Sequence, residues 1–107
     1  MDTEELLAHS RTRFDHAAAK RTLKEKYQGK FVLAYAGGMF RATTELISFL
    51  DVCVKMNHHN EKDIVLLDLY ENPVSVNIIE LRKLVYQKYC EQMLAWLNEY
   101  EELSKNR

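Results

Sequence analysis

The last third of the chain carries a heptad repeat, and this repeat predicts one long helix. Aromatic and apolar residues recur every seven positions in two series offset by three: Tyr86, Met93 and Tyr100, followed by Tyr89, Trp96 and Leu103. This is the a/d pattern of a helix that buries one face along its length. Asn77 can cap its N-terminus, and Glu80 three residues later suits a capping box. From about Asn77 to Ser104 the helix would be about 40 Å long, whereas a compact domain of this size has a radius of gyration of about 13 Å. The helix is therefore expected to form the spine of the fold or to extend beyond it.

The composition predicts one globular domain, residues 1–107, of an intracellular, cytoplasmic protein. Hydrophobic residues make up 47% of the chain and charged residues 29%, which argues against disorder. No apolar run approaches the roughly 18 residues that a membrane span needs, and the acidic stretch Met1–Glu5 lacks the layout of a signal peptide. Cys53 and Cys90 stand in apolar helical patterns without metal-ligand spacing. We therefore expect reduced core thiols, with a disulfide between them as the alternative.

A first helix is predicted from about Thr3 to Tyr27, with Thr3 as its N-cap and Gly29 at its end. Its apolar face is thin and consists of Leu6, Leu7, Phe14, Ala17, Ala18, Leu23 and Tyr27. A helix that buries so little gains little from docking on its own core. We therefore expect residues 1–22 to be mobile or to dock on a partner.

Residues Lys30 to Thr43 predict a first β-hairpin. Gly37-Gly38 separates two runs that alternate with the period of a strand. A type I′ turn needs positive φ at both of its central residues, and two glycines meet that need without steric cost. The alternative is a phosphate cradle of backbone N–H groups, but the Lys or Ser/Thr and the helix start that accompany such loops are missing.

Residues Asp63 to Asn77 predict a second hairpin. Ile64–Leu67 is apolar on both faces, which is typical of a central strand. Glu71-Asn72 is expected to make the turn. Pro73 then opens a return strand at the edge of the sheet, because proline cannot donate to a β-ladder.

A short helix lies between the two hairpins, and it completes the fold. Thr43 or Thr44 can cap it, and its buried side is expected at Leu46, Ile47, Phe49, Leu50, Cys53 and Val54. The element order is then α-β-β-α-β-β-α. We predict an α+β fold in which the two hairpins form one small, mainly antiparallel sheet covered by helices, followed by the long C-terminal helix.

No pattern in the chain carries catalytic or cofactor chemistry. Asp68 and Glu71 share a hairpin, but positions so near a turn are ordinarily solvated. Ser48 has no glycine elbow, and His58-His59 has no third metal ligand at useful spacing. We therefore expect a protein that is not an enzyme and binds no cofactor or metal. His58 and His59 are the residues to suspect in the weaker alternative, a small enzyme or metal protein.

Charge is unevenly distributed behind a formal net charge of −1. Between Arg11 and Lys30 the chain has seven Lys or Arg against two acids, whereas the final helix is acidic at Glu91, Glu99, Glu101 and Glu102. One candidate for phosphate contacts with a nucleic acid is the basic set Arg13, Lys20, Arg21 and Lys24. The alternative is that the basic helix pairs with the acidic end of the last helix, in the same chain or in a neighbour.

The C-terminal helix offers a stronger candidate, a surface that binds protein. Tyr89, Trp96 and Tyr100 supply large rigid rings with polar tips, a composition enriched at interfaces. Up to about Met93 we expect the sheet to cover this face, but beyond it the helix outruns strands of about 17–20 Å. The candidate partner-binding residues are therefore Tyr89, Trp96, Tyr100 and Leu103.

The chain also contains the stretches LKEKY at Leu23–Tyr27, YAGGMFRAT at Tyr35–Thr43 and WLNEY at Trp96–Tyr100. These stretches resemble small uncharacterised proteins of T4-like tailed bacteriophages, including cyanophages, over about Leu23 to Leu103. The resemblance implies a virion or assembly component, or a small protein that binds a host or phage partner. It assigns no functional residue.

We therefore expect a non-catalytic interaction module that self-associates as a homo-oligomer, or docks onto a larger protein assembly, through its terminal helices. The alternative is a nucleic-acid-binding accessory protein that uses the basic N-terminal helix.

Overall fold

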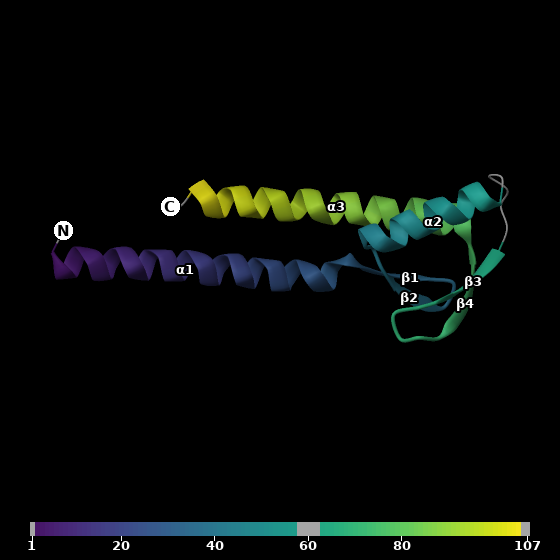
Figure 1. The fold of residues 1–107 in the computed structure, drawn as a ribbon, viewed down its shortest axis with the longest axis horizontal. Helices are drawn as coiled ribbons and strands as arrows, with labels where there is room; N and C mark the ends of the chain where they lie inside the picture. The colour runs from purple at the N-terminus through teal and green to yellow at the C-terminus, as the bar shows by residue number, and fades with distance from the viewer. Residues whose placement is uncertain (1, 58–62, 106–107) are drawn as a thin grey trace. The chain divides into compact units, whose positions relative to one another are not determined.

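The structure is a computed structural model that describes residues 2–57 and 63–105, with the backbone alone described for residues 8–14. Figure 1 shows its α+β fold, and the predicted order of helices and strands is confirmed. The elements are α1 (Thr3–Gln28), the 3₁₀ turn η1 (Gly29–Phe31), β1 (Val32–Tyr35), β2 (Gly38–Arg41), α2 (Thr44–Met56), β3 (Asp63–Leu67), β4 (Pro73–Asn77) and α3 (Ile78–Lys105). None of the helices in these ranges combines the length and the apolar character that crossing a membrane requires.

The chain forms two compact units, and α3 contributes to both. Residues 1–30 and 93–107 make up the helical unit, and residues 31–92 make up the mixed unit, which contains β1, β2, β3, β4 and α2. Within the helical unit, α1 and the C-terminal half of α3 run side by side in opposite directions (Figure 1). That residues 1–107 fold as one domain stays a prediction.

The caps of the helices follow side-chain chemistry that the sequence contains. At α3 the predicted cap is confirmed, because Asn77 Oδ1 accepts the backbone N–H of Glu80 at 3.0 Å. Thr43 Oγ1 likewise accepts the N–H of Leu46 at 3.1 Å. At α1 the predicted cap is wrong by one residue: Asp2 caps the helix by accepting the N–H of Glu5, and Thr3 is already helical. A carboxylate one position earlier offers the same acceptor and also suits the positive end of the helix dipole.

The first hairpin forms, but its turn lies one residue earlier than the glycine pair predicts. Tyr35 pairs with Gly38, so Gly38 belongs to β2. The two central residues are Ala36 and Gly37, with φ of 51° and 84°, the positive values that a type I′ turn requires. Gly38 is needed for another reason: a Cβ at this position would lie 2.7 Å from Val74 Cγ2.

The second hairpin pairs β3 with β4, from Asp63 opposite Asn77 to Leu67 opposite Pro73. In the described residues the two hairpins make two separate two-stranded sheets, which differs from the single joint sheet expected from the sequence. β3 therefore has one neighbouring strand, and the prediction that Ile64–Leu67 is a central strand is wrong for this chain on its own. Edge placement of Pro73 agrees with the structure, because β4 also has a single neighbour.

Asp68 joins the two hairpins. Its Oδ2 accepts the N–H of Met39 from the first hairpin, and its Oδ1 accepts the N–H groups of Tyr70 and Asn72 in its own loop, at 2.9–3.1 Å. The expectation that this carboxylate is solvated is wrong, because its side chain is only 9% exposed. The backbone N–H of Asn72, foremost among these donors, lowers the pKa of Asp68, since hydrogen bonds to a carboxylate favour its charged form.

The core of the mixed unit is built on one row of α3 residues. Ile78, Leu81 and Val85 are completely buried, and their spacing of three and four places them on one side of the helix. Tyr86 is 59% exposed, so the buried row is offset from the predicted a/d face in this half of the helix. Other buried apolar side chains come from the strands, their flanks and α2: Phe31, Phe40, Ala42, Leu50, Val54 and Val76. Phe49, expected on the buried side of α2, is instead exposed.

Candidate protein-docking site on α3

Aromatic stacking joins α1 to the C-terminal half of α3 in the helical unit. The rings of Tyr27 and Trp96 are parallel within 1°, with centroids 5.8 Å apart. Tyr27 is 2% exposed, and this burial, before any other cause, raises the pKa of its hydroxyl. Trp96 is therefore a packing residue of its own unit as well as a candidate contact for a partner.

Charged groups border this aromatic pair. Lys26 Nζ lies 2.8 Å from Glu99 Oε1. The hydrogen bond between them raises the pKa of Lys26 and lowers that of Glu99. Lys20 Nζ lies 5.6 Å from the centre of the Tyr100 ring, within the range of a cation–π contact. Part of the basic face of α1 thus contacts the C-terminal half of α3, as the alternative interpretation of its charge expects.

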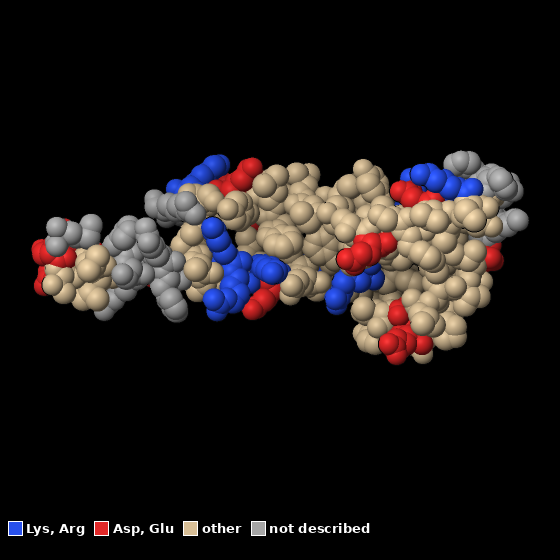
Figure 2. Space-filling model, viewed as in Figure 1, with Lys and Arg blue, Asp and Glu red and all other residues tan. Residues whose placement is uncertain are grey.

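An apolar hollow lies on α3 beside these contacts. It is a shallow, open depression of about 250 Å³ and is lined by Met93, Trp96, Leu97 and Tyr100. Their spacing of three or four residues aligns them along one stripe of the helix. Leu97 is 49% exposed and the neighbouring Leu94 is 60% exposed. In Figure 2, uncharged atoms cover most of α3 between its ends on the face drawn, whereas Lys and Arg side chains gather over α1.

The structure separates the four predicted partner-binding residues. Trp96 and Tyr100 line the hollow. Tyr89 belongs to the mixed unit, where its ring packs on Phe31 with centroids 5.9 Å apart. Leu103 is half-buried in the helical unit and is not among the residues that line the hollow. Sequence reasoning did not single out Leu97 as a site residue, because it lies outside both heptad series.

The four predicted phosphate-contacting residues are also placed differently. Lys20 lies over Tyr100, while Arg21 and Lys24 are exposed on α1. The side chain of Arg13 lies outside the described residues.

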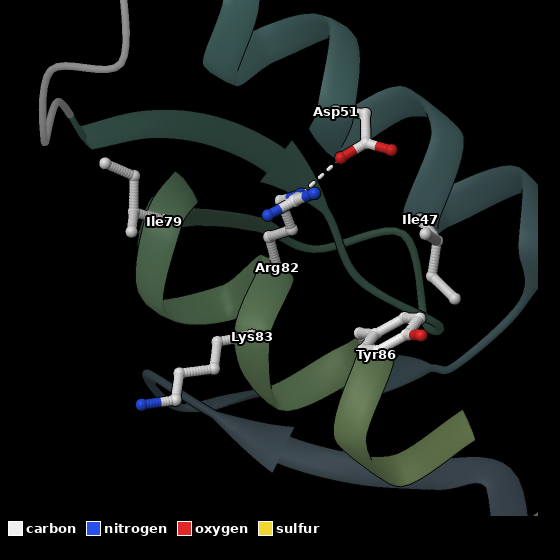
Figure 3. Close-up of a pocket in the computed structure, with 6 residues that line it drawn as sticks. All are labelled: Ile47, Asp51, Ile79, Arg82, Lys83 and Tyr86. Atoms are coloured by element: carbon white, nitrogen blue, oxygen red, sulfur yellow. Dashed lines mark hydrogen bonds and ion pairs between the residues drawn. The ribbon is translucent and has the colours of Figure 1, made fainter. Parts of the chain in front are cut away.

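A second hollow, of about 550 Å³, lies in the mixed unit between α2 and α3 (Figure 3). Asp51 on α2 forms an ion pair with Arg82 on α3, and Lys83 points away from this pair. Ile47, Ile79 and Tyr86 supply the remaining walls. Asp51 neutralises the Arg82 guanidinium, so the remaining charged side chain among those that line the hollow is Lys83.

The cysteines and histidines of the described residues form neither a disulfide nor a metal-binding cluster. Neither cysteine is in a disulfide; Cys53 is half-buried and Cys90 is exposed, so Cys90 is not the core residue expected. A hydrogen bond with Cys90, before any other cause, raises the pKa of the Tyr86 hydroxyl. No group of three or more His, Cys, Asp or Glu in the described part of the chain could hold a metal ion. His58 and His59 lie outside the described residues.

Comparisons of the chain with protein-family models, with curated proteins and with solved structures find no match. Function is therefore inferred from the residues themselves.

Proposed function

We propose that the protein is a non-catalytic protein-interaction module, and that the hollow on α3 is where it holds a protein partner. The observation that carries the proposal is the hollow itself: four large apolar or aromatic side chains line it, and Leu97 leaves about half of its surface in water. Exposing apolar area costs free energy in proportion to that area, at roughly 25 cal/mol per Å². A partner that covers these side chains recovers this free energy.

The partner that suits this stripe is an amphipathic helix. The lining residues Met93, Trp96, Leu97 and Tyr100 repeat at helical spacing, so apolar side chains spaced by three and four on a second helix would interdigitate with them. Trp96 and Tyr100 are residue types that often dominate binding energy at interfaces. No Lys, Arg, Asp or Glu lines the hollow, which favours an apolar protein segment over a phosphate or another anion.

The resemblance to proteins of T4-like bacteriophages adds a finer proposal. The module would then serve in a virion or its assembly, or would bind a host or phage protein. The partner helix would come from one of these proteins.

Site-specific photo-crosslinking tests the docking site directly. A photoreactive phenylalanine analogue is introduced at Leu97, inside the hollow, and separately at Asn98, the next residue of the same helix. Asn98 is exposed and does not line the hollow. After irradiation in cells that naturally carry the gene, position 97 is expected to give discrete protein adducts that position 98 does not. Equal adduct patterns at the two positions would refute the docking site.

A second measurement separates self-association from binding to another protein. Leu97→Lys and Asn98→Lys add the same charge on and off the hollow, and light scattering after size exclusion reports the oligomeric state of each. Mass spectrometry of the adducts identifies the bound segment. Met93→Lys, at another residue that lines the hollow, is expected to abolish the adducts formed at position 97, with the fold retained by circular dichroism.

A further inference from the structure

The strand β3 has a sequence that suits two neighbours, but the described structure gives it one. Ile64–Leu67 is apolar at every position, a composition typical of an interior strand whose two faces are both covered. β3 pairs only with β4. Val65 is 68% exposed and Leu67 is 65% exposed, although both are large apolar residues in the middle and at the end of a strand.

β3 lacks the lysine, the proline and the bulge that often protect an edge strand from pairing. An edge strand presents backbone N–H and C=O groups that another strand can bind, and natural proteins block such edges with lysine, proline or a bulge. β4 has Pro73, which lacks an N–H group. β3 has no proline and no basic residue, and Asp63 at its first position is its only charged side chain.

We propose that β3 pairs with β3 of a second copy of this chain, antiparallel and centred on Val65. The pairing creates a four-stranded sheet in the order β4-β3-β3-β4 across the dimer. It satisfies backbone groups along both open edges, and it brings the Val65 side chains of the two copies together on one face of the sheet.

The charge of Asp63 favours the antiparallel arrangement over a parallel one, and the self-complementary apolar pattern of β3 favours a second copy as the occupant. Centred on Val65, the antiparallel register sets Asp63 of each copy opposite Leu67 of the other. A parallel in-register pairing would instead set the two Asp63 carboxylates side by side, and like charges directly opposite one another are destabilising. The apolar pattern of Ile64, Val65 and Leu66 reads the same in both directions about Val65, so the edge complements itself. Such a two-fold interface closes on itself as a dimer.

This interface is independent of the docking site on α3. β3 and β4 belong to the mixed unit, and Met93, Trp96, Leu97 and Tyr100 belong to the helical unit. A dimer formed through β3 therefore uses none of the residues that line the hollow on α3.

Oligomeric state measured by sedimentation and by light scattering tests the inference. Val65→Lys places two ammonium groups against each other at the centre of the dimer, and it is expected to weaken dimerisation by about tenfold or more. The matched control is Ser75→Lys, because Ser75 is exposed and is paired with Val65 on β4, a strand that carries no part of the interface. This control is expected to dimerise like the wild type, and circular dichroism checks that both variants are folded.

Cysteine cross-linking gives a second readout that does not depend on affinity. In a background with Cys53→Ala and Cys90→Ser, Val65→Cys is expected to form a disulfide-linked dimer under mild oxidation, because residues directly opposite in an antiparallel pair have the separation that a disulfide needs. Ser75→Cys is expected not to do so. A wild-type protein that stays monomeric at several hundred micromolar would overturn the inference. So would a dimer that Leu97→Lys dissociates and Val65→Lys does not, and that second outcome would leave the docking site on α3 in place.

Discussion

Gly38→Ala should destabilise the protein, although alanine is ordinarily the better residue in a structured segment. Gly38 lies in β2, and its φ is not in the left-handed region, so the backbone itself admits alanine. Space does not. The added Cβ would lie 2.7 Å from Val74 Cγ2, 3.2 Å from Asp68 Cβ and 3.3 Å from Phe40 Cε2, and the nearest of these contacts is shorter than real Cβ contacts allow.

The expected cost follows from the stiffness of the neighbours. Val74 is β-branched and held in β4, so its side chain has few other χ1 rotamers into which it can move aside. Asp68 is held by hydrogen bonds to both hairpins. Overpacking of this kind costs about 1–3 kcal/mol, and the lower entropy of the unfolded chain offsets about 0.4–1 kcal/mol of it. A net loss of about 1–2 kcal/mol lowers the melting temperature by about 4–16 °C for a domain of this size.

Gly29→Ala is the matched control. Gly29 has a right-handed φ of −77°, and a Cβ there would meet nothing within 4 Å. The same substitution is therefore expected to stabilise the protein by about 0.4–1 kcal/mol through the unfolded state alone. The two variants should move the melting temperature, measured by circular dichroism, in opposite directions.

A double-mutant cycle identifies the cause. Val74→Ala removes the carbon nearest to the new Cβ, so Gly38→Ala with Val74→Ala should be less destabilised than the sum of the two single changes, by about 0.5–3 kcal/mol. The reasoning is refuted if Gly38→Ala melts at or above the wild-type temperature, or if the two substitutions are simply additive.

Further predictions concern the hydrogen bonds of Asp68 between the two hairpins, the buried core, and the stacked rings of Tyr27 and Trp96. Asp68→Asn should remove part of the acid sensitivity of folding: the folded-state pKa of Asp68 is lowered, so its contribution is present at neutral pH and is lost as pH falls below about 4. Melting temperatures from pH 2.5 to 7 check this, with Glu71→Gln in the same loop as the control. Leu81→Ala, at a fully buried position, should lower the free energy of unfolding, measured with urea, by about 2–5 kcal/mol. This loss should be well above that of Leu97→Ala at its half-exposed site. Trp96→Ala should lower the free energy of unfolding by about 0.5–1.5 kcal/mol through loss of the ring pair, in addition to the loss of buried area. Trp96→Phe should recover part of this stability. Trp96 is the only tryptophan, so wild-type fluorescence reports on the helical unit while circular dichroism reports on the whole chain. Coincident transitions are expected if residues 1–107 fold as one domain.

Local signals in the sequence account for the elements. The caps at Thr43 and Asn77 can be recognised because each side chain accepts a backbone N–H only three residues away. The hairpin at Gly37 and the edge strand opened by Pro73 follow from backbone geometry that few residues adopt or exclude. Helix and strand order is therefore legible without any knowledge of packing.

Which side chains are buried and which are exposed could not be predicted from local sequence in the same way. Asp68 reads as a solvated turn residue, because the N–H of Met39 that it accepts comes from another hairpin, 29 positions away in the chain. The heptad series predicts a buried Tyr86, yet the core takes Ile78, Leu81 and Val85, because an α-helix can bury any stripe that its neighbours cover. Leu97 joins the candidate site for the same reason.

The sequence by itself determined the kind and the order of the helices and strands, since capping, turn chemistry and hydrophobic period act within a few residues; the cap of α1 and the turn of the first hairpin each lie one residue from the predicted position. Tertiary structure alone decided that, within residues 2–57 and 63–105, the hairpins form separate sheets and β3 pairs only with β4. It also decided that Gly38 serves close packing and that Trp96 stacks on Tyr27. Each of these depends on which distant segments meet, and the free energy of that meeting is shared among contacts that no single stretch of sequence contains.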